Sequence, residues 1–150
     1  MTLTVRPAGV EDVARLAPLF DLYRVFYLQP SDPALAQAFL LQRLQRGESV
    51  VLLALDGDGA AGFTQLYPAF SSVFAQRTWI LNDLFVAPAA RRRGIARALL
   101  DAAAGFARQD GALRLELETD LDNHHAQALY RRLGWTPYND TLRFRLTLQD

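Results

Sequence analysis

The 150-residue sequence contains no cysteine and no lysine. The absence of cysteine excludes a disulfide framework, a thiolate metal site and a cysteine nucleophile. Because lysine is absent, all the basic side chains are arginines, and each keeps its charge at physiological pH. No apolar run approaches the roughly 18 residues that a membrane-spanning helix needs.

Net charge is also absent, because 16 basic residues balance 16 acidic ones. A chain without a global field is not expected to recruit nucleic acid or an anionic membrane. The two histidines, His124 and His125, are neighbours, and adjacent helix positions do not share a face, so we expect no metal site. Residues 1–6 alternate like a strand and lack the apolar block of a signal peptide, so a soluble cytoplasmic protein is the default expectation.

The remaining composition is typical of one globular α/β domain. Hydrophobic residues make up 51% of the chain, no repeat divides it, and we expect a single domain over residues 1–150. Apolar spacing predicts helices at residues 9–27, 33–46, 94–109 and 123–133. It predicts strands at residues 2–6, 49–55, 61–70, 80–86, 113–118, 135–138 and 142–148. The strands at 49–86 are expected to pair antiparallel, and the strand at 113–118 parallel to 80–86 in a βαβ unit.

The most informative stretch joins the strand at 80–86 to the helix that follows it. Arg91, Arg92 and Arg93 stand directly before Gly94, where that helix begins. The first backbone N–H groups of a helix lack intrahelical partners and carry partial positive charge. A glycine at that point lets an anion approach these groups closely. The stretch therefore predicts a phosphate site that suits a pyrophosphate.

Two motifs in this part of the chain resemble one family. Arg91-x-x-Gly94-x-Ala96 resembles the acetyl-CoA signature of the GNAT N-acetyltransferase superfamily. A second motif resembles the other conserved block of that superfamily: Asn123-x-x-Ala126-x-x-Leu129-Tyr130-x-x-x-Gly134-Trp135. The resemblance implies a mixed, largely antiparallel sheet of six to seven strands with a central parallel βαβ unit and flanking helices. It also implies acetyl-CoA as cosubstrate.

The resemblance further implies how acetyl-CoA binds. Backbone amides of residues 92–97 would hold the pyrophosphate, and backbone groups of residues 84–86 would pair with the pantetheine arm as a pseudo-strand. Asn123 and Ala126 would line the opposite side. The expected contact residues are Leu84, Phe85, Val86, Arg91, Arg92, Arg93, Gly94, Ile95, Ala96, Arg97, Asn123, Ala126 and Tyr130.

Tyr130 and Asn82 are the candidate catalytic residues. A tyrosine is protonated at neutral pH and can donate to the departing CoA thiolate, as such tyrosines do in many GNAT members. The structural alternative for Tyr130 is an aromatic on the apolar stripe of its helix. The segment around Asn82 looks like the diamine acetyltransferase branch, which has a glutamate there. Because Asn82 is neutral, we expect it to orient a water that relays the proton of the amine.

The acceptor site is less sharply indicated. Asp83 points to the face of the strand opposite Asn82, so it is either structural or binds substrate across a dimer. Tyr23 and Tyr27 end the first helix, where family members place pocket residues, and core packing is their alternative. The expected substrate-binding residues are thus Tyr23, Tyr27, Asn82 and Asp83. Residues 67–74 fit an acceptor pocket and a dimer surface equally well.

The sequence as a whole predicts an N-acetyltransferase that moves acetyl directly to the amine of a small molecule in a ternary complex. The candidate acceptors are a polyamine, an amino acid or a related metabolite. One alternative is a protein N-terminus or lysine acetyltransferase, and another is a non-catalytic acyl-CoA sensor, for which a proton donor at Tyr130 has no use. The resemblance also implies a homodimer. The acceptor and the general base stay open.

Overall fold

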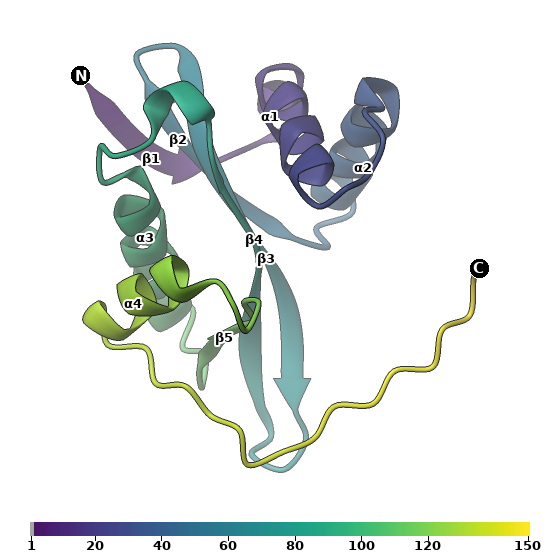
Figure 1. Ribbon diagram of the computed structural model, residues 1–150, viewed down its shortest axis with the longest axis vertical. Coiled ribbons are helices and arrows are strands. Elements are labelled where there is room, and N and C mark those ends of the chain that lie inside the picture. Colours follow the sequence, from purple (N-terminus) through teal and green to yellow (C-terminus); the bar gives the residue numbers. More distant parts are fainter. Residues whose placement is uncertain (1) are drawn as a thin grey trace. The chain divides into compact units, whose positions relative to one another are not determined.

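The computed structural model describes residues 2–150, so Met1 of the predicted domain lies outside the described residues. The chain forms two compact units, one ending at Glu118 and one beginning at Thr119 (Figure 1). A single domain over the whole chain stays a prediction. Among residues 2–150, no helix is both long and apolar enough to cross a membrane.

The first unit is built on a five-stranded sheet with the order β1-β2-β3-β4-β5. The first four strands pair antiparallel with their neighbours, and β5 pairs parallel with β4. The strands are β1 (Leu3–Pro7), β2 (Val50–Asp56), β3 (Gly59–Ser71), β4 (Gln76–Val86) and β5 (Leu115–Leu117). The predicted mixed, largely antiparallel sheet with a parallel βαβ unit is confirmed, although it has five strands and not six to seven.

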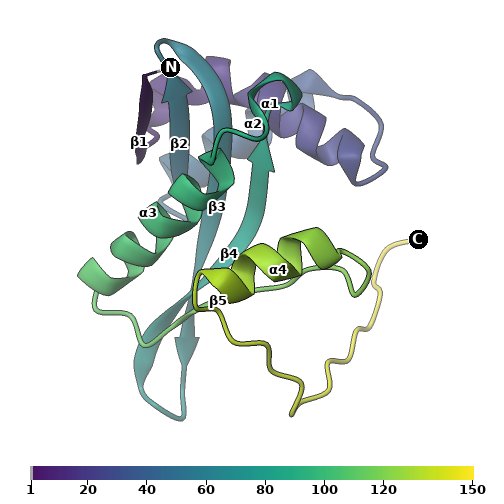
Figure 2. The ribbon, with the colours of Figure 1, turned by 60° about the vertical axis from the view of Figure 1, so that its left-hand side comes forward.

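Helices cover both faces of this sheet (Figure 1, Figure 2). They are the short 3-10 helix η1 (Val10–Asp12), α1 (Val13–Phe26), α2 (Pro33–Gln45), the short 3-10 helix η2 (Pro88–Ala90) and α3 (Ile95–Gln109). The helices α1 and α2 lie on one face, where Phe20 and Leu40 join a core with Phe63 of β3. The helix α3 lies on the other face. Because both faces are covered, β2 is a continuous apolar run and not an alternating one.

The start of α2 confirms the local sequence signals. The side chain of Asp32 accepts a hydrogen bond from the backbone N–H of Leu35 at 3.1 Å, and Pro33 occupies the first turn. The carboxylate of Asp21 in α1 accepts from the backbone N–H of Asp32 at 2.8 Å and from Ser31 Oγ at 2.7 Å. These hydrogen bonds hold the second half of α1 close to the start of α2.

The second unit contains α4 (His124–Arg132), which begins as the sequence predicts. The strands expected at residues 135–138 and 142–148 are wrong, since residues 133–150 contain no helix or strand. An alternating sequence gives a segment its two faces, but a strand also requires ladder hydrogen bonds to a neighbour. The apolar positions of the last segment are instead 84–92% exposed: Leu142, Phe144, Leu146 and Leu148.

Asp12 holds the turn between β1 and α1 in place. Its carboxylate, 1% exposed, accepts two hydrogen bonds at 2.8 Å from the guanidinium of Arg6 and one at 2.9 Å from the backbone N–H of Gly9. These bonds, led by the one from Arg6, lower the pKa of Asp12 from 3.8 to about 2. The folded state thus gains stability above the unfolded pKa and loses it as the pH falls from there toward 2.

We predict that Asp12→Asn lowers the free energy of unfolding at neutral pH by about 1–2 kcal/mol, at the low end if solvent around the part-exposed Arg6 screens the pair. The difference from wild type should shrink as the pH falls through the range 4 to 2. Urea unfolding across this pH range measures it. Asp58→Asn, at an exposed turn position, is the control and should change stability little. A difference that does not vary with pH would contradict the assignment.

Candidate active site

A bulge in β4 opens one side of that strand. The register of β3 and β4 shifts between Gln65 and Leu66. Gln65 pairs with Asp83 and Leu66 pairs with Leu81, so Asn82 has no opposite residue. On its other side β4 pairs with β5 only over Trp79–Leu81. In the described part of the chain, residues 82–86 therefore have a strand partner on one side alone.

The bulge also decides which backbone groups face the open side. The backbone N–H of Ala87 bonds to the carbonyl of Ala61 at 2.8 Å, on the β3 side. Because ladder bonds alternate along an antiparallel strand, the backbone groups of Val86 and Leu84 point away from β3. The Val86 carbonyl accepts from Arg91 Nε at 3.3 Å. An extended amide-bearing chain can pair with an open strand edge of this kind.

The loop that leads into α3 has the backbone of an anion site. Arg92 and Gly94 both have positive φ, at 65° and 75°. The backbone N–H of Ala98 is bonded to the carbonyl of Gly94, whereas a helix start leaves the preceding N–H groups unbonded. No side chain caps this helix start, and nothing lies within 4 Å of the Cβ position of Gly94. A phosphate can thus approach these amides, as the sequence predicts.

The arginines around this loop differ in what they contact. Arg93 pairs with Asp56 at 3.5 Å, and Arg97 pairs with Asp101 at 3.8 Å. The guanidinium of Arg91 lies 5.6 Å from the centroid of the Phe85 ring. Arg92 is exposed, so its charge is available to an anion at the loop. We therefore expect a pyrophosphate to be held mainly by the backbone amides, with a smaller contribution from the guanidinium groups.

A buried polar network lies beneath the bulge. The Asp83 side chain, 2% exposed, accepts from Gln65 Nε2 at 2.6 Å and from Asn82 Nδ2 at 2.7 Å. Gln65 in turn accepts from Ser49 Oγ at 2.8 Å, and Thr64 Oγ1 donates to the Asp83 carbonyl at 2.7 Å. Burial raises the pKa of Asp83, while the hydrogen bonds from its neighbours oppose that rise.

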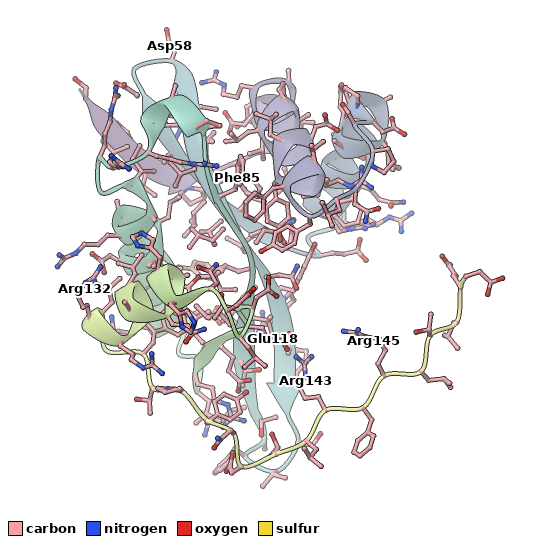
Figure 3. The ribbon with its side chains drawn as sticks, viewed as in Figure 1. Asp58, Phe85, Glu118, Arg132, Arg143 and Arg145 are labelled. Carbon is pink, nitrogen blue, oxygen red and sulfur yellow. The ribbon has the colours of Figure 1, made fainter. Side chains whose placement is uncertain are left out.

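Tyr23 connects this network to α1. Its hydroxyl donates toward the Asn82 carbonyl at 3.4 Å and lies 3.5 Å from Asp83 Oδ1. Its ring contacts the rings of Tyr27 and Phe85, and Phe85 extends from β4 toward α1 (Figure 3). Burial, with the nearby Asp83 charge second, raises the pKa of Tyr23 far above its ordinary value. Tyr23 is therefore a neutral hydrogen-bond donor at any physiological pH.

The structure brings together the four residues predicted to bind substrate: Tyr23, Tyr27, Asn82 and Asp83. Gln65, which sequence reasoning did not assign to the site, belongs to the same region. So does Tyr67, the first residue of the segment 67–74 that fits an acceptor pocket and a dimer surface equally well. Burial, followed by the Asp83 charge, raises the pKa of Tyr67 to about 12. The sequence does carry a signal for Gln65, because it is a long polar side chain within an apolar strand run.

The remaining predicted residues belong to the second unit. Asn123 caps α4, because its side chain accepts from the backbone N–H of Ala126 at 3.2 Å. Tyr130 lies on α4 with its ring 6.2 Å from that of Trp135. The backbone N–H of Trp135 also bonds to the Tyr130 carbonyl at 3.0 Å. Their predicted roles toward acetyl-CoA and the thiolate stay predictions.

The chain is similar to known acetyltransferases over most of its length. A profile of the acetyltransferase (GNAT) family matches residues 16–135. An uncharacterized N-acetyltransferase of Bacillus subtilis (strain 168), YhfO, is 49% identical over 133 residues, or 89% of each protein. The solved structure of a probable acetyltransferase has a TM-score of 0.91 and 41% identity, and the match covers 100% of this chain and 99% of that one. The streptothricin acetyltransferase of Streptomyces lavendulae is 33% identical, over 88% of this chain and 79% of that protein.

This chain therefore belongs to the GNAT family of acetyltransferases. It is an N-acetyltransferase, of a family that generally uses acetyl-CoA as the acetyl donor. The predicted GNAT fold and enzyme class are confirmed. Residues 2–150 contain no cluster of three or more side chains able to hold a metal ion.

We predict that Gly94→Ala weakens CoA binding by about tenfold or more, because its Cβ would strain a left-handed backbone and crowd the loop amides. Gly57→Ala is the matched control. Gly57 also has a positive φ, 61°, and open space around its Cβ position, but it lies in the β2–β3 turn. Both variants should lose about 1 kcal/mol of stability. Calorimetric titration measures the affinity of each variant for CoA, and equal affinities of the two variants would contradict the assignment.

Proposed function

We propose that this enzyme transfers acetyl from acetyl-CoA directly to the amine of a small-molecule acceptor while both are bound. The observation that carries the proposal is the open edge of β4 at residues 82–86, directly followed by the loop and α3 start at residues 91–97. An amide-bearing arm and a pyrophosphate are the two chemical groups that these features fit, and CoA contains both. A cytoplasmic location stays a prediction from the sequence.

The residues of the first unit fit the donor without a covalent enzyme intermediate. Backbone groups of Leu84 and Val86 would hold the pantetheine amides, and an N–H in this edge would polarise the acetyl carbonyl. The amides of residues 94–97 and the guanidinium of Arg92 would hold the phosphates. Because the chain has no cysteine, transfer through an enzyme thiol has no nucleophile, which supports direct attack by the amine.

Proton transfer is assigned to two residues. The amine acceptor is an ammonium ion at neutral pH and must lose a proton before it attacks. Asn82 is exposed, and its amide nitrogen donates to Asp83, which fixes the amide and leaves its oxygen to accept from a water. That water would take the proton of the ammonium group and pass it to bulk solvent, because the amide itself is no base. Tyr130 would donate its hydroxyl proton to the departing CoA thiolate. Asn123 and Ala126 would line the CoA arm.

A small amine is the acceptor that we favour. A relative named for the acetylation of streptothricin covers most of the chain. Tyr23 and Tyr27 would contact the acceptor beside Asn82, while the buried Asp83 would act through the hydrogen bonds that orient Asn82 and Tyr23. Acetylation of protein N-termini or lysines is the second candidate activity, and acyl-CoA sensing without turnover is the third.

The test is release of CoA thiol over a panel of amines. We predict that Tyr130→Phe lowers kcat by about 10²- to 10⁴-fold, the range of general acid catalysis, and leaves acetyl-CoA affinity nearly unchanged. Tyr138→Phe, at an exposed tyrosine of the same unit, is the control and should keep full activity. Tight acetyl-CoA binding without turnover on any amine would favour the sensor. Equal kcat for both variants would remove Tyr130 from catalysis.

We also propose that the enzyme is a homodimer joined through its last segment. Residues 141–148 alternate polar and apolar, and the four apolar side chains are 84–92% exposed. Arg143 and Arg145, two of the polar residues in this alternation, are labelled in Figure 3. A row of exposed apolar side chains at strand spacing marks an interaction surface. A second copy presents the same row, so the two segments can cover each other.

We predict that wild type has the mass of two chains in light scattering and that Phe144→Asp with Leu146→Asp has the mass of one. The physical reason is that the charges fall within the apolar row. Thr141→Asp with Thr147→Asp places the same charges on the opposite side of the segment and should stay dimeric. A monomeric wild type, or a dimeric Phe144→Asp, Leu146→Asp variant, would contradict this interface.

A further inference from the structure

Arg24, in the last turn of α1, has a guanidinium nitrogen without a partner. Its Nη1 is buried and, in the part of the chain that the structure describes, no other buried side-chain nitrogen or oxygen lacks a hydrogen bond. A buried N–H without an acceptor loses its hydration and gains nothing in return. Folded proteins rarely leave such groups unpaired. An acceptor that comes from outside the chain accounts for this one.

Arg24 lines a hollow of about 260 Å³ between α1 and α2. The other lining residues are Phe20 of α1 and Leu35 and Phe39 of α2. Each helix contributes two residues four positions apart, which places them on one side of that helix. Three apolar walls and one cationic donor suit a ligand with an apolar body and a single anionic group.

No acid within the described residues neutralises Arg24 in an ion pair. Asp21, one turn earlier on α1, uses its carboxylate oxygens to accept from Ser31 and from the backbone of Asp32. The hydrogen bonds from Ser31 and from the Asp32 backbone lower the pKa of Asp21, and the charge of Arg24 adds to that effect at longer range. The buried Nη1 of Arg24 still has no acceptor and is left for a ligand. Leu35, which forms one wall of the hollow, is half exposed and can move to admit one.

The hollow lies one aromatic ring away from the bulge of β4. The ring of Phe20 stacks on that of Phe39 at 5.7 Å and on that of Tyr23 at 6.0 Å. Tyr23 carries the hydroxyl that reaches the Asn82 carbonyl. A molecule with its anionic group at Arg24 can thus extend along these rings toward the site assigned to acetyl transfer.

We infer that the hollow binds the carboxylate of the acceptor, so that the acceptor carries its amine and a carboxylate at opposite ends of an apolar chain, as a long ω-amino acid does. The assignment of the amine rests on the proposed function, whereas the carboxylate site rests on Arg24 and its hollow. The guanidinium would pair with the carboxylate, and Phe20, Leu35 and Phe39 would surround the apolar group.

The test compares three amines that share one apolar chain: 8-aminooctanoate, 8-aminooctanamide and heptylamine. Of these, only 8-aminooctanoate carries a carboxylate. We predict that Arg24→Met lowers kcat/KM for 8-aminooctanoate by about 10- to 100-fold, the value of a charge-assisted hydrogen bond, and changes it less than about threefold for the other two. Arg24→Lys should lose less than Arg24→Met, because it keeps the charge. Arg46→Met, at the exposed arginine directly after α2, is the control and should leave all three unchanged. An equal loss for the three amines would overturn the inference.

A binding experiment separates this inference from the proposed function. Octanoate has the carboxylate and the apolar chain but no amine, and calorimetry measures its affinity without turnover. Wild type should bind it about 10- to 100-fold more tightly than Arg24→Met. This result with no acetylation of any amine would support the carboxylate site and overturn the proposed function. Acetylation of heptylamine, with octanoate bound equally or not at all by both proteins, would do the reverse. Arg24→Met should unfold at no lower urea concentration than wild type, since it removes an unpaired buried donor.

Discussion

The bulge at Asn82 is the constraint on which the rest of the first unit depends. A strand inside a sheet can be paired on both sides along its whole length, but β4 pairs with β5 only over Trp79–Leu81. The inserted residue changes which backbone groups face outward, so the open edge begins where β5 ends. Without the bulge, the backbone groups of Leu84 and Val86 would face β3, and the edge would offer different groups to an extended ligand.

Such a bulge needs support, because its residue has no ladder partner. Asp83 provides that support from the next position, where its buried carboxylate is held by Gln65 and Asn82. The network extends to Ser49 at the edge of β2 and to Tyr23 on α1. A buried carboxylate is stable only when its oxygens are bonded, so each partner restricts the others. Asn82 is thereby oriented by the same contacts that position α1.

Local signals in the sequence were sufficient for elements with local causes. Asp32 and Pro33 specify a helix start by themselves. The missing side chain of Gly94 predicts the close approach of an anion, whereas its positive φ of 75° was not predicted from the sequence. The bulge was not predictable, because it arises from the relative register of β3 and β4. Gln65 shows the same limit, since only pairing with Asp83 and Ser49 gives it a role. The segment 142–148 has strand alternation, but alternation specifies a face and not a partner.

The charges around the acceptor side follow from these placements. Asp83 is 2% exposed and bonded within the chain, so it offers no open carboxylate to a cationic substrate. Tyr23 and Tyr67 stay neutral because burial raises the pKa of each. Phe39 also lines a second, more open hollow with Arg43 and Glu48, and Arg43 pairs with Glu48 at 3.0 Å. A polyamine would thus find its one lining acid already paired, whereas an acceptor with a carboxylate would find Arg24 unpaired.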